Sequence, residues 1–310
     1  MRDSASSTRV GFDTSRGGDP LTATLWFIGV STGRSLINAA FPVWMGDLGR
    51  DVRLIGRDLP PGSPRESYRA LVAGLRADPS AIGAVITTHK VAVARAAGDL
   101  IDSLDPLAAE CGEINSLVCT PTGLAGFARD PLSIGRVVDE IWPRGDEVAC
   151  LGAGGSAIAL GRHLLSRPAP PARLVFADRD EIAAGHLRSV LSPWSDRITV
   201  RVGPGPWDDL VAAAPPGTLV VNATGLGKDR PGSPLTAGAG FPPAAVVWEL
   251  NYRGDLALLR QARALGAEAY DGWNLFCHGW AAALGPILGL PDEVATARRF
   301  AELAGPLRTR

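Results

Sequence analysis

The chain has 310 residues, of which 46% are hydrophobic and 20% are charged, and its formal net charge at pH 7 is −1. These values are typical of a globular protein that is long enough to form two domains. The near-zero charge argues against a nucleic-acid partner, and the lack of an apolar stretch of roughly 18 residues argues against a membrane-spanning helix.

The first half of the chain alternates short apolar runs with amphipathic stretches. Residues 1–20 are small and polar and predict a flexible leader without a signal peptide. After them the sequence predicts strand, helix, strand, helix and strand at 21–30, 35–49, 51–59, 67–77 and 81–88. This alternation is typical of parallel βαβ units.

Lys90 comes directly after the third of these strands. Lysine occurs only at positions 90 and 228, although the chain has 31 lysine and arginine residues in total. An arginine stays protonated, whereas a lysine can have its pKa shifted and can exchange a proton. Lys90 is therefore a candidate catalytic residue, and a solvated residue at the end of a strand is the alternative.

A second alternating unit begins with a strand at 148–151. Strands at 171–180, 198–203, 217–225 and 244–250 follow, with helices predicted after the first strand and at 181–191 and 255–266. The apolar segment that starts at Trp273 predicts helix that packs back on the body of the protein. Both halves together predict an α/β fold.

A glycine-rich turn links the strand at 148–151 to the helix that follows. Gly152, Gly154 and Ala157 form the pattern G-x-G-x-x-A. The first glycine permits a tight turn, the second lets the backbone approach a pyrophosphate, and the alanine lets the helix pack on the strand. We expect a dinucleotide to bind Gly152, Ala153, Gly154, Gly155, Ser156 and Ala157. A glycine turn without a ligand is the alternative.

The residues after the next strand bear on the type of dinucleotide. A carboxylate at this place accepts hydrogen bonds from the ribose 2′-OH and repels a 2′-phosphate. Asp178 holds this position and Asp180 adds negative charge, whereas the guanidinium of Arg179 could hold a 2′-phosphate. The two carboxylates favour NAD, and NADP remains possible.

Eight segments, taken in order from about residue 24 to residue 290, resemble motifs of the shikimate/quinate dehydrogenase family. The glycine turn resembles the family's glycine loop, AVITTHK (84–90) resembles N-V-T-x-P-x-K, and CGEINS (111–116) resembles G-A-x-N-T. The remaining segments are GVSTGRSLINAAF (29–41), GFARD (126–130), NATGLG (222–227), ELNYRGD (249–255) and DGWNLFCHGWAA (271–282).

The resemblance implies a two-domain enzyme. An N-terminal α/β substrate domain would comprise residues 21–131 and 271–310, because the C-terminal helices return to it. A Rossmann-type, doubly wound nicotinamide-binding domain would comprise residues 132–270. The resemblance also implies that Asn222, Ala223, Thr224 and Gly272 contribute to the cofactor site.

The resemblance places the family's catalytic lysine at Lys90 and its partner aspartate at Asp130. Oxidation of a secondary alcohol requires a base that takes the hydroxyl proton. Burial in a cleft can lower the pKa of a lysine, and a nearby carboxylate orients it and limits that fall. Asn115 would hold a substrate hydroxyl. Asp130 could also cap the helix that begins with Pro131.

The sequence departs from the family pattern on the substrate side. Ser31 and Tyr252 are kept, whereas Gly33 and Arg34 replace a serine and a proline. Arg129 replaces a threonine, and Gly279 replaces a glutamine. Because a bidentate arginine can anchor a carboxylate, we expect an anionic substrate that is not shikimate itself. Arginines that point away from the cleft are the alternative.

The sequence therefore predicts an oxidoreductase that moves a hydride between a nicotinamide and a cyclic hydroxy acid or its ketone, in general or specialised metabolism. A methylene-tetrahydrofolate dehydrogenase and a non-catalytic NAD(P)-binding regulator are the alternatives. Four cysteines without metal-type spacing indicate reduced thiols and no catalytic metal. We expect a cytoplasmic monomer or homodimer whose partner is a small anionic molecule.

Overall fold

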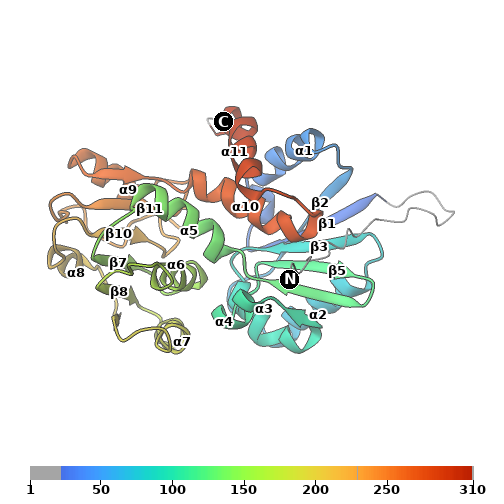
Figure 1. Cartoon of the computed structure of the whole chain (residues 1–310), viewed down its shortest axis with the longest axis horizontal. Coiled ribbons are helices and arrows are strands. Elements are labelled where there is room, and N and C mark those ends of the chain that lie inside the picture. Colours follow the sequence, from blue (N-terminus) through green and yellow to red (C-terminus); the bar gives the residue numbers. More distant parts are fainter. Residues whose placement is uncertain (1–21, 229, 309–310) are drawn as a thin grey trace, which may run out of the picture.

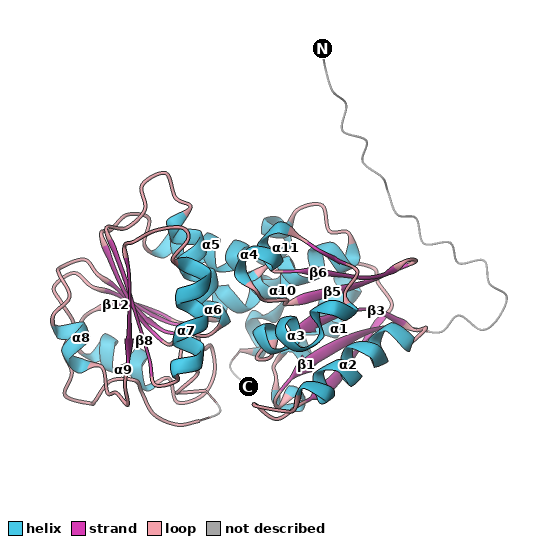
Figure 2. Cartoon of the chain, turned by 90° about the horizontal axis from the view of Figure 1, so that it is seen from below, coloured by secondary structure: helices cyan, strands magenta, loops and turns pink. Residues whose placement is uncertain are grey.

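The computed structural model describes residues 22–228 and 230–308, so the leader predicted at 1–20 lies outside the described residues. Two six-stranded sheets form two lobes that lie side by side (Figure 1). Seen from below, each sheet has helices packed on its faces (Figure 2). No helix within these described ranges is long and apolar enough to cross a membrane.

The N-terminal lobe contains a mixed sheet with the strand order β2-β1-β3-β5-β6-β4. Its strands are β1 (Ala23–Gly29), β2 (Val52–Asp58), β3 (Ala81–Ile86), β4 (Ser103–Leu104), β5 (Ser116–Thr120) and β6 (Gly123–Phe127). Its helical segments are η1 (Thr32–Arg34), α1 (Ile37–Asp47), α2 (Arg65–Ala77), α3 (Lys90–Ala97), η2 (Gly98–Leu100) and α4 (Pro106–Cys111).

The parallel βαβ units predicted here are confirmed for β1, β2 and β3, which pair in parallel. The sheet then continues with an antiparallel hairpin of β5 and β6, which was not predicted from the sequence. The hairpin brings the residues before β5 and after β6 to the end of β3 where α3 begins.

The second lobe contains a fully parallel sheet with the order β12-β11-β10-β7-β8-β9. Its strands are β7 (Glu147–Leu151), β8 (Arg173–Asp178), β9 (Ile198–Val202), β10 (Leu219–Asn222), β11 (Val246–Glu249) and β12 (Glu268–Tyr270). Its helices are α6 (Gly155–Leu165), α7 (Glu181–Leu191), α8 (Asp208–Ala212) and α9 (Ala257–Ala264).

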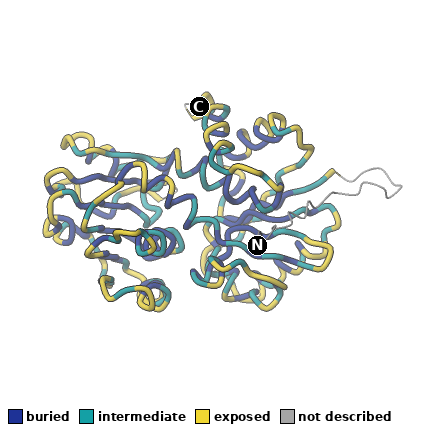
Figure 3. The backbone as a smooth tube through the Cα atoms, viewed as in Figure 1, coloured by how far each residue is buried: buried dark blue, intermediate teal, exposed yellow. Residues whose placement is uncertain are grey.

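The strand order of this sheet reverses between β7 and β10, and ligands of doubly wound sheets bind at such a point. All four residues of β10 are buried, as are the last four of β7, because helices cover both faces of the sheet. Figure 3 shows buried residues in the middle of both lobes, where the sheets lie. The fixed sheet thereby positions the glycine turn that follows β7.

Two helices lie between the sheets in Figure 1, namely α5 (Asp130–Ile141) and α10 (Trp273–Leu288). Helix α11 (Glu293–Ala304) follows and ends in the short segment η3 (Gly305–Leu307). Both C-terminal helices share a hydrophobic core with β1 and α1, in which the Trp44 ring stacks on Phe300 at 4.1 Å. The predicted fold class is confirmed, and the residue limits of the domains stay a prediction.

Candidate active site

A buried ion pair joins the N-termini of α3 and α5. Lys90 is the first residue of α3 and Asp130 is the first residue of α5, and the lysine Nζ donates to Oδ2 of the aspartate. The two side chains are only 12% and 16% exposed. The structure therefore brings together the two residues that were predicted to be catalytic.

Asn115 fixes the aspartate from the other side. Its Nδ2 donates to Oδ1 of Asp130 at 2.7 Å, while its Oδ1 accepts the backbone N–H of Arg129 at 2.8 Å. The second contact fixes the orientation of the amide, because only the oxygen can accept. The helix-capping alternative for Asp130 does not occur, since the cap position is Arg129 and no side chain caps the helix.

The surroundings of Lys90 hold its proton. Burial favours the neutral amine, but the charges of Asp130 and Glu113 and the hydrogen bond to Asp130 outweigh it, so the pKa of Lys90 is raised above 10.5. The expected net lowering of this pKa is wrong, because Asp130 and Glu113 together outweigh the effect of burial. Lys90 is an ammonium at neutral pH.

Glu113 is the second of these carboxylates, and it was not among the predicted site residues. Its side chain is fully buried, and neither carboxylate oxygen has a hydrogen-bond partner. A Cβ added to Gly155 would collide with Oε2 of Glu113 and would lie 3.6 Å from Cε of Lys90. Burial raises the pKa of Glu113 to about 8, although Lys90 lowers it.

The glycine turn approaches the neighbouring loop closely. Gly152 has a φ of 117°, and a Cβ there would lie 2.6 Å from the carbonyl carbon of Ala223. Gly154 caps α6, which starts at Gly155, and Ala157 is fully buried beneath it. The first amides of a helix have no partner within the helix, so those at Gly155 and Ser156 suit an anionic ligand.

Asp178 ties β8 to the glycine turn. Its Oδ2 accepts the backbone N–H of Ala153 at 2.7 Å, and its Oδ1 accepts that of Asp180 at 3.0 Å. The carboxylate of Asp180 caps α7 by accepting from the backbone of Ile182 and Ala183. Arg179 is exposed. Asp178 is thus the carboxylate beside the turn, whereas Asp180 caps the next helix.

Asn222 organises the loop that follows β10. Its Oδ1 accepts from Thr224 through the backbone N–H at 3.1 Å and Oγ1 at 2.7 Å, and its Nδ2 donates to Glu249 at 2.6 Å. Burial raises the pKa of Glu249 to about 7. Ala223 donates its backbone N–H to Leu151 at 2.7 Å. These bonds hold the loop against the glycine turn.

Gly272, the last of the predicted cofactor residues, caps α10, and a Cβ there would collide with the backbone of Leu250. The glycine thus lets the start of α10 pack closely on the segment that leaves β11. This packing is a structural reason for a glycine at the position.

A cavity of about 320 Å³ lies beside η1 and brings together two predicted substrate residues, Arg34 and Tyr252, and two further arginines. Burial raises the pKa of the Tyr252 hydroxyl there, although hydrogen bonds to Ser35 and Arg253 lower it. Ser31 precedes η1, and its backbone carbonyl accepts the backbone N–H of Arg34 at 3.1 Å. Ser31 does not line this cavity. The polar residues that line it are Arg34, Ser35, Asn38, Tyr252, Arg253 and Arg308.

Two other predicted substrate residues do not line this cavity. The guanidinium carbon of Arg129 lies 5.0 Å from the centre of the Phe127 ring, and its buried Nε has no hydrogen-bond partner. Gly279 lies on α10, and a Cβ there would have no atom within 4 Å. His89 is structural, because its two ring nitrogens contact the Tyr68 hydroxyl and the carbonyl of Leu59.

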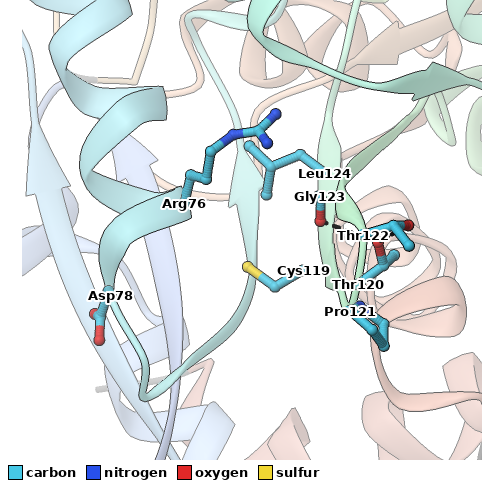
Figure 4. A pocket seen from close by; sticks show the side chains of 8 residues that line it. All are labelled: Arg76, Asp78, Cys119, Thr120, Pro121, Thr122, Gly123 and Leu124. Carbon is cyan, nitrogen blue, oxygen red and sulfur yellow. Dashed lines mark hydrogen bonds between the residues drawn. The ribbon is translucent and has the colours of Figure 1, made fainter.

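A hollow of about 400 Å³ lies beside the turn between β5 and β6 (Figure 4). It is lined by Arg76, Asp78, Cys119 and residues 120–124, none of which was predicted to be functional. Among residues 22–228 and 230–308, no group of three or more His, Cys, Asp or Glu residues could hold a metal ion. The ion pair of Lys90 and Asp130 beside the glycine turn is the candidate active site.

Comparisons with known proteins agree with this geometry. The chain is 30% identical over 251 residues to shikimate dehydrogenase (NADP(+)) of Rhodospirillum rubrum. That match covers 79% of this chain and 85% of the other protein. This chain is 33% identical over 263 residues to shikimate dehydrogenase (NADP(+)) of Methylobacterium radiotolerans, with 80% and 86% covered. The chain belongs to the shikimate/quinate dehydrogenase family. No protein-family model matches the sequence.

The fold of the shikimate/quinate dehydrogenase family extends over most of the chain. Quinate dehydrogenase from Corynebacterium glutamicum, solved in complex with NAD, is 25% identical with a TM-score of 0.68. That match covers 91% of this chain and 99% of the other. The resemblance predicted from the sequence is therefore confirmed.

The shikimate/quinate dehydrogenase motif G-A-x-N-T contains the signal that could have revealed Glu113. Aligned with residues 112–116, the motif has alanine where this chain has Glu113. A carboxylate in place of a methyl group changes both charge and volume. The substitution is compatible with the fold because Gly155, which faces Glu113, has no side chain.

The residues of the second lobe fit the dinucleotide that a shikimate/quinate dehydrogenase needs. The close approach at Gly152 and the amides at the start of α6 suit a pyrophosphate. Lys90 lies at the edge of this turn, since its Cε comes within 3.6 Å of a Cβ placed on Gly155. Lys90 and the glycine turn therefore lie side by side.

Proposed function

We propose that this member of the shikimate/quinate dehydrogenase family moves a hydride between a nicotinamide cofactor and a cyclic hydroxy acid or its ketone. The observation that carries the proposal is the buried ion pair of Lys90 and Asp130 beside Gly155 of the glycine turn. A proton-exchanging group at the edge of a dinucleotide site is what reversible oxidation of an alcohol requires.

The raised pKa of Lys90 sets the resting state for each direction of the reaction. In ketone reduction, the ammonium donates a proton to the substrate oxygen as the carbonyl carbon receives the hydride. In alcohol oxidation, Lys90 must first lose its proton and then takes the hydroxyl proton. The bound nicotinamide supplies or accepts the hydride, and Asp130 and Asn115 keep the amine in place.

We propose NAD as the preferred cofactor, with NADP accepted less well. The support is Asp178, whose carboxylate lies against the glycine turn through Ala153 and would repel a 2′-phosphate. Replacement of Asp178 by asparagine removes the charge and keeps one acceptor oxygen for the backbone N–H of Ala153. The ratio of kcat/KM for NADP to that for NAD is expected to rise about tenfold in this variant, and an unchanged ratio contradicts the preference.

We propose that the substrate carries negative charge beyond that of a single carboxylate, and so differs from shikimate. The support is the group of three arginines at the cavity near Tyr252, namely Arg34, Arg253 and Arg308. Arg308 also pairs with Asp271, which leaves the cavity with a net positive lining. Guanidinium groups bind carboxylate and phosphate groups with paired hydrogen bonds.

A panel of cyclic hydroxy acids tests both parts of the proposal. Purified protein with NAD is expected to form NADH with a member of the panel, and turnover should be faster with dianionic acids than with shikimate. Turnover of shikimate above all dianionic acids would contradict the altered substrate. Binding of NAD without turnover of any acid or ketone would favour the non-catalytic regulator.

A further inference from the structure

Glu113 has no task in the mechanism above, although it lies at the centre of the site. Its carboxyl group is fully buried without a hydrogen-bond partner. Leaving a polar group unpaired in the interior is costly, and native proteins rarely do so without a functional reason. The unpaired carboxyl group therefore indicates that it binds a proton or lies beside a ligand.

The carboxyl group faces the place where the second lobe would hold a pyrophosphate. Its Oε2 occupies the space beside Gly155, the first residue of the eleven-residue helix α6. The positive end of a helix dipole and its free amides attract an anion to this point. A buried ionised carboxylate beside such an anion would repel it, because the interior screens charge poorly.

The other groups around Glu113 decide its charge before a ligand arrives. Lys90 of α3 favours the ionised form, whereas burial and Asp130 of α5 favour the neutral acid, and the resulting pKa is about 8. The thiol of Cys111 on α4 has a pKa raised to about 12 and stays uncharged. At pH 7 Glu113 is thus mostly a neutral acid that can donate a hydrogen bond.

We propose that Glu113 couples the binding of the reduced dinucleotide to the uptake of one proton at the glycine turn. The proposal rests on the cofactor named in the proposed function. Its basis is linkage: a ligand that repels the ionised form of a group raises the affinity of that group for a proton. Reciprocally, the protonated protein binds that ligand more tightly.

NADH is the probe, because its nicotinamide ring is uncharged and it lacks a 2′-phosphate that titrates. Its affinity is measured by fluorescence titration without substrate between pH 6.5 and 9.5. We expect wild type to bind NADH about tenfold more weakly at pH 9.5 than at pH 7, which corresponds to a rise of about one unit in the pKa of Glu113.

Glu113→Gln is the matched variant, because the amide stays neutral at every pH. It is expected to bind NADH with the same affinity across the range and more tightly than wild type at pH 9.5. The difference between the two proteins isolates Glu113 from Glu249, whose pKa is about 7. Glu110→Gln is the control, because Glu110 lies three residues earlier on α4 and pairs with Arg162, and it should keep the wild-type profile.

Calorimetry at pH 8 in two buffers of different ionisation enthalpy gives a second readout. Wild type is expected to take up about half a proton per NADH bound, and the Gln variant none. Glu113→Ala, which restores the residue of the family motif, should also take up none. Wild-type binding that is independent of pH, or a Gln variant with the wild-type slope, would overturn the coupling.

The outcomes separate this coupling from the proposed function. Turnover by a protein that binds NADH without proton uptake supports the dehydrogenase and overturns the coupling. Proton-linked NADH binding by a protein that turns over no acid or ketone supports the coupling and contradicts the dehydrogenase.

Discussion

Replacement of Asp130 by asparagine tests how the site holds a charged lysine inside the protein. The amide keeps an acceptor for Asn115, which donates to Asp130 at 2.7 Å, but removes the charge opposite Lys90. The lysine is 12% exposed, so its ammonium loses its main partner while water cannot replace it. Breaking a buried pair by removing one partner costs about 3–5 kcal/mol.

We expect a loss near the lower bound, about 3 kcal/mol at pH 6, because the Lys90 side chain keeps 12% exposure to water. In wild type the raised pKa of Lys90 contributes stability that is complete below pH 10.5 and is lost only as the pH rises through the folded value. In the Asn variant, burial lowers the lysine pKa, so its penalty is greatest at low pH. The penalty shrinks toward pH 9 as Lys90 deprotonates and Glu113 ionises.

The assay is thermal unfolding followed by tryptophan fluorescence at pH 6 and pH 9. A loss of about 3 kcal/mol corresponds to a Tm decrease of roughly 6–12 °C for a domain of this size. The double variant Lys90→Met with Asp130→Asn is the control, because removal of both charges should restore most of the stability. A Tm decrease below about 2 °C, or a larger decrease at pH 9 than at pH 6, would refute the reasoning.

Three further outcomes are expected. Alcohol oxidation should accelerate with pH up to at least pH 10, because Lys90 must lose a proton that its raised pKa holds. Ketone reduction should be fastest near neutrality. Equal pH profiles for the two initial rates would contradict the assignment of Lys90. Arg34→Ala should raise KM for the anionic substrate about tenfold with little change in kcat, and an unchanged KM would remove Arg34 from the substrate site. Gly152→Ala should abolish NADH binding in titrations, because its φ of 117° and the 2.6 Å approach of Ala223 exclude a Cβ.

Continuous apolar runs made the second lobe readable from the sequence. The helix predicted at 181–191 occurs as Glu181–Leu191, and the strands predicted at 171–180 and 198–203 occur as Arg173–Asp178 and Ile198–Val202. The hairpin of β5 and β6 was not predicted because its two strands are short and carry polar or small residues such as Thr120 and Gly123. Its place in the sheet depends on pairing with β3, which local pattern does not encode.

Within the site, motif order predicted the contact between Lys90 and Asp130, because both residues fall on recognisable segments. The direction of the lysine pKa shift was wrong, because Asp130, joined by Glu113, a residue near Lys90 only in space, outweighs burial. The two arginines at 253 and 308 likewise meet Arg34 only after the chain folds. Sequence therefore predicted that Lys90 and Asp130 meet, and the structure was needed for the charges that surround them.

The rate of hydride transfer in the Lys90→Arg variant is the most direct test of the central claim. That claim is that the group paired with Asp130 exchanges a proton with the substrate. Arginine keeps the positive charge but cannot give up its proton. The variant is therefore expected to fold and to bind NADH as wild type does. Transfer of deuterium from the hydroxyl-bearing carbon of the substrate to NAD should be about 10²–10⁴-fold slower. Transfer within a few-fold of the wild-type rate would contradict the account.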